Sequence, residues 1–213
     1  MNNLVATLIS FAYIILVIGI SFVLYKKKVL SSESVRKMIH ILVSFWVFIL
    51  VYCYSSLYWA LLGPVSFIFL NALAVYSGVG KELGMNDRKR DNGLIYYPFS
   101  VAVMTIFMYK DVLAPSSVVA STLIMGLGDG LAALVGKKIG KHKISIFSSV
   151  KSLEGSAVMA FIAFILLLAI TELSLPAMIL ISLVLAAVEA ITPLGLDNIS
   201  VPLLSALLIE VFS

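Results

Sequence analysis

Charged residues and cysteines are both scarce in this sequence. Asp, Glu, Lys and Arg make up 12% of its 213 residues, whereas soluble domains carry about 25%. This scarcity excludes a soluble fold, and with it a basic domain that binds nucleic acid, in spite of the net charge of +4. The single cysteine, Cys53, lies in an apolar run, which excludes a disulfide framework and a thiolate metal site.

Hydrophobic residues dominate instead, at 62% of the chain, and the mean hydropathy is +1.12. A membrane-spanning helix needs about 20 apolar residues. The sequence therefore predicts an all-α fold, a polytopic transmembrane bundle of seven or eight helices in a single domain over residues 1–213. The helices are expected at residues 4–25, 38–54, 57–77, 94–109, 115–135, 156–171, 175–191 and 199–212.

Positive charge is confined to one set of loops. Eight helices place residues 26–37, 78–93, 136–155 and 192–198 on one side of the membrane, and these loops hold 14 of the 15 Lys and Arg residues; Lys110 lies opposite. Short loops rich in Lys and Arg face the cytosol. We expect an integral, multi-pass protein with both termini outside and its polar chemistry at the cytosolic face. The small size favours a prokaryotic plasma membrane, or the endoplasmic reticulum membrane in a eukaryote.

The fifth predicted helix contains a carboxylate between two glycines, Gly128-Asp129-Gly130. A carboxylate inside a membrane usually marks a functional site or a paired interior, and a hard cation such as Mg²⁺ would suit Asp129. In the alternative interpretation, Gly126, Gly130 and Ala133 form a stripe of small residues for close helix packing, and Asp129 is hydrogen-bonded inside the bundle.

A lysine precedes the sixth predicted helix, where residues 151–155 read Lys-Ser-Leu-Glu-Gly. Ser152 can cap this helix, and the unpaired N–H groups of its first turn form an anion site beside Lys151. Lys137, in the basic loop before it, could attract a polyphosphate or anionic lipid headgroups. A P-loop is excluded because its upstream glycine and preceding strand are missing. An interfacial anchor is the alternative for Lys151.

Further polar residues lie at two other helix ends. Glu189, Asp197 and Asn198 surround a Pro/Gly break that can line a polar cavity, although Asp197 and Asn198 could instead cap the last helix. The loop at 86–93 mixes both signs of charge and is interpreted as a lid.

At the start of the second helix, Arg36, Lys37 and His40 share one face and could contact phosphate or a lipid headgroup. The alternative is that Arg36 and Lys37 extend to the interface as anchors and that His40 is structural.

These blocks, in this order, resemble the polyprenol kinase family of dolichol and phytol kinases over residues 34–205, leaving residues 1–33 as a first helix and basic loop. The resemblance implies a kinase that uses Mg²⁺ and a nucleoside triphosphate, usually CTP, to phosphorylate an isoprenoid alcohol. It implies catalytic roles for Asp129, Lys151, Glu189 and Asp197, with Asp129 and Asp197 as metal ligands. The implied nucleotide-binding residues are Gly128, Gly130, Lys137, Lys151, Ser152, Glu154, Gly155 and Asn198, and those for phosphate or headgroup are Arg36, Lys37 and His40.

Two other functions remain as alternatives. Phosphatidate cytidylyltransferases have a related membrane fold and share the Lys-(Ser/Thr)-x-Glu-Gly turn, but their C-terminal signature is absent here. A non-enzymatic transporter or scaffold is the alternative of another class, although a transporter would have polar residues near the middle of the bilayer. The alcohol, the choice between CTP, ATP and UTP, and the oligomeric state stay open; a homo-oligomer is compatible with the sequence.

Overall fold

The computed structural model describes residues 1–77, 91–146 and 149–213. Its helices confirm the predicted all-α bundle. Six predicted spans each form one helix: α1 (Asn3–Lys26), α4 (Leu57–Ser77), α6 (Gly93–Tyr109), α9 (Leu153–Ile170), α10 (Leu175–Ile191) and α11 (Asp197–Phe212).

The other two predicted spans are subdivided. The second starts earlier than expected and comprises α2 (Ser32–Ser44) and α3 (Val47–Cys53), and the fifth comprises α7 (Pro115–Leu123), the π-helical turn η2 (Ile124–Asp129) and α8 (Gly130–Ile139). Between α2 and α3, the N–H groups of Phe45 and Trp46 donate to carbonyls three residues back, which tightens the helix for one turn. In the described part of the chain, five helices are long and apolar enough to cross a membrane.

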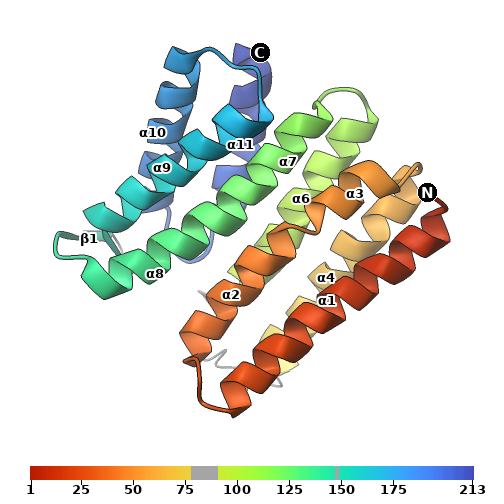
Figure 1. The fold of residues 1–213 in the computed structure, drawn as a ribbon, viewed down its shortest axis with the longest axis horizontal. Coiled ribbons are helices and arrows are strands. Elements are labelled where there is room, and N and C mark those ends of the chain that lie inside the picture. Colours follow the sequence, from red (N-terminus) through yellow and green to blue (C-terminus); the bar gives the residue numbers. More distant parts are fainter. Residues whose placement is uncertain (78–90, 147–148) are drawn as a thin grey trace.

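The continuous helix α7-η2-α8 forms the centre of the bundle (Figure 1). The rest of the protein buries 72% of the apolar span of this helix, whereas it buries only 22–28% of each of the other four long spans. It runs between α2 and α3 on one side and α9 and α11 on the other. A polar group on this helix is therefore shielded from lipid by protein, which is where intramembrane charges are tolerated.

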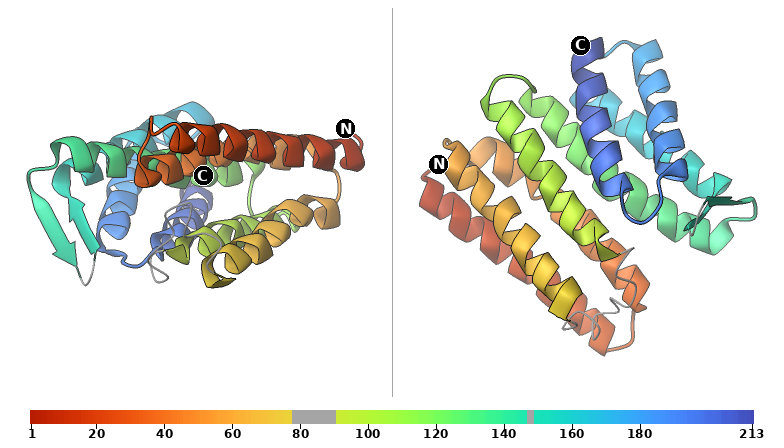
Figure 2. Two further views of the ribbon diagram at one scale, coloured as in Figure 1. Left: turned by 90° about the horizontal axis from the view of Figure 1, so that it is seen from below. Right: turned by 180° about the vertical axis from the view of Figure 1, so that it is seen from behind.

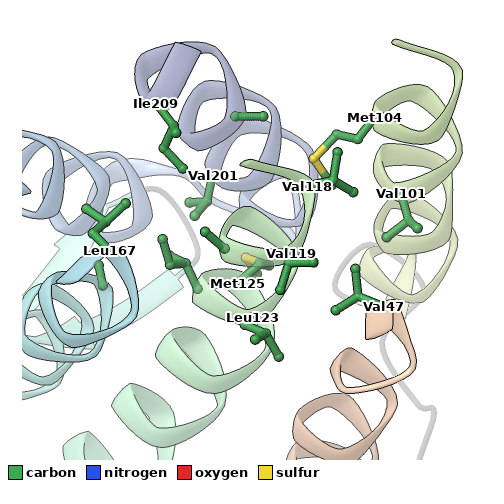
Figure 3. Packing of buried hydrophobic residues seen from close by; sticks show 14 of the residues in the cluster. Val47, Val101, Met104, Val118, Val119, Leu123, Met125, Leu167, Val201 and Ile209 are labelled. Carbon is green, nitrogen blue, oxygen red and sulfur yellow. The ribbon is translucent and has the colours of Figure 1, made fainter. Parts of the chain in front are cut away.

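Apolar side chains of the central helix pack against side chains of α3, α6, α9 and α11 (Figure 3). The residues labelled there come from α3, α6, α7, η2, α9 and α11, and they include Val47, Val101, Met104, Val118, Val119, Met125, Leu167, Val201 and Ile209. On the outside of the bundle, large apolar side chains such as Leu8, Phe69 and Phe161 are exposed. Exposed apolar surface on this scale fits a protein surrounded by lipid.

A two-stranded antiparallel hairpin was not expected from the sequence. Strands β1 (Lys143–Ile146) and β2 (Ser149–Ser152) pair in a register that places Lys143 opposite Ser152. The hairpin lies at one edge of the molecule, and both chain termini lie away from it (Figure 2). We call its end of the bundle, with residues 27–31 and 192–196, the charged end.

Candidate functional site

Three carboxylates from three different helices meet at the charged end. Asp129 ends η2, Glu189 lies in the last turn of α10, and Asp197 is the first residue of α11. Each offers a carboxylate oxygen within 4.8 Å of the other two. All three residues are buried, with exposed fractions of 8%, 4% and 8%. The π-helical turn contributes to this geometry because its wider winding rotates the residues that follow it, and such turns are frequent at functional sites.

Two lysines neutralise part of this acidic cluster. Lys37 Nζ lies 2.6 Å from Asp129 Oδ2. Lys151 Nζ lies 2.7 Å from Glu189 Oε1 and 3.0 Å from Asp197 Oδ2, and it also donates to the backbone carbonyl of Glu189. Burial acts to lower the pKa of Lys151, but the carboxylates of Asp197 and Glu189 outweigh it and raise this pKa above its ordinary value. Lys151 is therefore an ammonium ion at neutral pH.

A cavity of about 660 Å³ opens over the acidic cluster at the charged end. This volume lies within the range of about 300–1,000 Å³ that is usual for ligand pockets. Besides the three carboxylates, the cavity is lined by basic side chains from α2, α8 and the hairpin, which are Arg36, Lys37, Lys137, Lys143 and Lys151. Converging cations above a set of buried carboxylates suit a polyphosphate that enters together with a divalent metal.

The loop between α10 and α11 forms another wall of the cavity. Leu194 and Gly195 both have left-handed backbone conformations, with φ of 61° and 79°. Glycine adopts this conformation freely, whereas a branched residue such as Leu194 does so only when the surrounding structure holds it there. The Asn198 amide donates to the Gly195 carbonyl at 3.2 Å and to Asp197 Oδ1 at 3.2 Å. Asn198 thereby fixes both the loop and the carboxylate, so its contacts differ from those of a helix cap.

The glycines beside Asp129 lie away from the cavity. A Cβ atom at Gly128 would collide with Met159 Sδ, and one at Gly130 would collide with Ile41 of α2. Gly126 approaches Ser44 in the same way. The structure thus places Gly128 and Gly130, which we expected to bind nucleotide, at helix contacts. Close approach of α2 and α9 to the central helix requires them there.

The turn before α9 is divided between the cavity and the hairpin. The predicted cap is confirmed, since Ser152 Oγ accepts from the Gly155 N–H at 3.1 Å. Ser152 and Gly155 line the cavity. Glu154 instead accepts from the His142 N–H and contacts His142 Nδ1 at 2.8 Å. These contacts hold the hairpin against the start of α9. We expected Glu154 to bind nucleotide, but it does not line the cavity.

The opening of α2 brings its polar residues to the site in different ways. Arg36 Nη1 pairs with Asp91 Oδ1 at 2.7 Å and also lines the cavity. His40 lies deeper, with Nε2 3.7 Å from Asp129 Oδ2 and its ring 4.6 Å from that of Tyr97. Residues 86–90 of the expected lid lie outside the described residues.

Sequence reasoning missed Glu33, which lines the cavity and pairs with Lys137 at 2.6 Å. It also missed the hairpin, which brings Lys143 of the basic loop to the cavity. Gly136 and Gly140 at the end of α8 line the cavity too and approach Ser152 Oγ. The hairpin had a detectable signal, because residues 143–146 read Lys-Ile-Ser-Ile, an alternation of polar and apolar residues with the period of a strand.

The acidic cluster fits a hard divalent cation. In the described part of the chain, two lysines pair with three carboxylates, so negative charge exceeds positive charge among these groups. Carboxylate oxygens are the ligands that Mg²⁺ prefers, and the ion usually takes few of them from the protein. Asp129 and Asp197, our predicted ligands, would hold such an ion, and Glu189 lies close enough to join them.

Comparison with known proteins gives one significant match. The chain is 27% identical to a phytol kinase from Synechocystis sp. over 192 residues, which cover 83% of this chain and 78% of that protein. No family model matches the chain, and no solved structure matches it at a significant level. The similarity is distant, and it agrees with the resemblance to polyprenol kinases expected from the sequence motifs.

Proposed function

We propose that this protein is a membrane-embedded kinase that transfers the γ-phosphate of a nucleoside triphosphate, CTP in the first instance, to the hydroxyl of an isoprenoid alcohol. The observation that carries the proposal is the convergence of Asp129, Glu189 and Asp197 under a cavity lined with lysines. The similarity to a phytol kinase supports the same reaction class. By the distribution of Lys and Arg, we propose that the charged end faces the cytosol.

Phosphoryl transfer depends mainly on positioning and on neutralisation of charge. Lys151 of β2 and Lys137 of α8, which both line the cavity, would bind the phosphate oxygens. Mg²⁺ bound at Asp129 and Asp197 would supply further positive charge beside the phosphates. Together these groups would favour the transition state, in which charge is spread over the oxygens of the transferred group.

The reaction joins the alcohol oxygen to the γ-phosphorus in line with the departing nucleotide. The bond between this phosphorus and the β–γ bridging oxygen breaks, and its electron pair leaves with the nucleoside diphosphate. The hydroxyl proton passes to Glu189 or Asp197, the two carboxylates that face Lys151. The products are an isoprenyl phosphate and, from CTP, CDP.

Labelled nucleotides test this proposal directly. Membranes containing the protein are incubated with phytol and CTP labelled at the γ-phosphate, and the label is expected in the lipid fraction. A cytidylyltransferase would instead transfer label from the α-phosphate when phosphatidate is supplied, and a transporter would transfer neither label. Repeating the assay with ATP and UTP decides the nucleotide preference.

Two variants test the site. Asp129→Asn and Lys151→Ala are each expected to lower turnover by about 10²–10³-fold, as loss of one preorganised charged group at a reaction centre does. Lys138→Ala is the matched control, because Lys138 lies at the same end of α8, is exposed and is not among the cavity residues. Near-normal turnover in either site variant, in protein that inserts normally, would contradict the assignment.

A further inference from the structure

A second cavity, almost entirely apolar, lies beside the cavity over the acidic cluster, which we call the acidic cavity. It has a volume of about 130 Å³ and is enclosed mainly by α1, α2, α4 and α6. Its walls include Val43, Phe67, Pro98 and Val101. Arg36 lines both cavities, so the two are neighbours across the first turns of α2.

His40 lies where the two cavities approach each other. It lines the apolar cavity, and its Nε2 is 3.7 Å from Asp129 Oδ2, which lines the acidic one. This nitrogen is buried and has no hydrogen-bond partner among the residues that the structure describes. Buried polar atoms nearly always have a partner in the functional protein. The unpaired nitrogen at the edge of an apolar cavity therefore indicates a ligand with an apolar body and one polar end.

We propose that the apolar cavity holds the hydroxyl-bearing end of the isoprenoid alcohol, with the hydroxyl oxygen accepting from His40 Nε2–H and the hydroxyl proton directed toward the cluster of Asp129, Glu189 and Asp197. This inference rests on the proposed function, which supplies the class of ligand. It assigns the lipid site to the face of α2 that adjoins the face lining the nucleotide cavity. The alcohol oxygen then lies next to the acidic cluster, and the lipid chain stays outside the acidic cavity.

The size of the apolar cavity determines which first unit of the alcohol can bind. An apolar cavity of about 150 Å³ accommodates a six-carbon ring, so a cavity of about 130 Å³ has room for one five-carbon isoprene unit with its methyl branch. The rest of the chain must leave toward the bilayer, and Ile18, which lines the cavity and is 39% exposed on α1, marks where the wall reaches the outer surface. The protein therefore selects the branched first unit and tolerates different chain lengths beyond it.

Narrowing the cavity tests the assignment. Val43 lies three residues after His40 on α2 and lines the cavity, so Val43→Phe places a ring where the methyl branch would lie. We expect kcat/KM for an isoprenoid alcohol to fall by about 10-fold or more, the effect of one misfitting apolar group in a pocket. An unbranched alcohol of equal length should lose less, and the Kd of labelled CTP should stay unchanged. Val65→Phe on α4, which is 39% exposed and does not line the cavity, should behave like the wild type.

The possible failures are separable. If the wild-type protein phosphorylates no isoprenoid alcohol, the proposed function is wrong. If the wild type is active and Val43→Phe retains the same preference for branched over unbranched alcohols, the cavity assignment is wrong.

Photolabelling of the wild-type protein covers the case in which Val43→Phe does not fold. An isoprenoid alcohol with a photoreactive group beside its first methyl branch should label the cavity walls at Val43, Phe67 or Val101. Labels confined to other helix faces would overturn the inference, whether or not phosphate is transferred.

Discussion

Replacing Lys151 with methionine is predicted to destabilise the charged end of the bundle strongly, because one ammonium group serves two buried carboxylates. Its Nζ lies 2.7 Å from Glu189 Oε1 and 3.0 Å from Asp197 Oδ2. Methionine retains much of the apolar stem and removes the charge. Both carboxylates then stay in a medium of low polarity without their cation, which is the unfavourable arrangement for buried charges.

The expected size of this effect follows from the burial of the pairs. Removing one partner of a buried ion pair costs about 3–5 kcal/mol, and we take the lower value, about 3 kcal/mol, because Asp197 borders the open cavity at the charged end. For a chain of this length, each kcal/mol corresponds to roughly 2–4 °C in Tm. The Tm of Lys151→Met should therefore be lower than that of the wild type by about 6–12 °C.

The assay is thermal unfolding of purified protein in detergent, followed by circular dichroism. Lys138→Met is the control, since Lys138 is exposed at the end of α8. Adding Asp197→Asn to Lys151→Met should recover part of the lost stability, because it removes one of the two unpaired charges. A Tm for Lys151→Met equal to that of Lys138→Met, or no recovery in the double variant, would refute the reasoning.

Three further predictions follow from individual contacts. Gly128→Ala should destabilise by about 1–3 kcal/mol through overpacking, because its Cβ would collide with Met159; the loss of Tm that it causes should be smaller in a Met159→Ala background than in the wild type, and an equal loss in both backgrounds would contradict the packing role. Ser152→Ala should cost about 1 kcal/mol by removing the cap that accepts from the Gly155 N–H, measured as a lower Tm, and an unchanged Tm would show the cap to be dispensable. The pKa of Lys151 is raised above its ordinary value of 10.5, so above neutral pH its ion-pair stabilisation is present up to that value and is lost as the pH rises through the folded-state pKa. On titration upward from neutral pH, the Tm difference between wild type and Lys151→Met should therefore shrink only at strongly alkaline pH, and shrinkage just above neutral pH would contradict the assignment.

Much of the candidate site could be found from the sequence because charge is expensive in a membrane. Asp129 and Glu189 stand out within apolar helices, and Lys151 and Asp197 stand at helix ends on the same predicted side. These four residues do converge in the structure. Their chemical roles remain predictions, as do CTP, Mg²⁺ and the cytosolic orientation.

The sequence by itself determined the all-α bundle of apolar helices and the gathering of charge at one end of them. Both depend on properties that are local along the chain, namely the length of an apolar run and the alternation of loops between two sides. Only the tertiary structure decided which faces of these helices meet, because apolar helices of similar composition carry no local mark of their partners. Helix packing placed Gly128 against Met159. It also placed His40 at the boundary between the two cavities. The hairpin itself is a local pairing, but only packing between distant segments of the chain brought its Lys151 between Glu189 and Asp197.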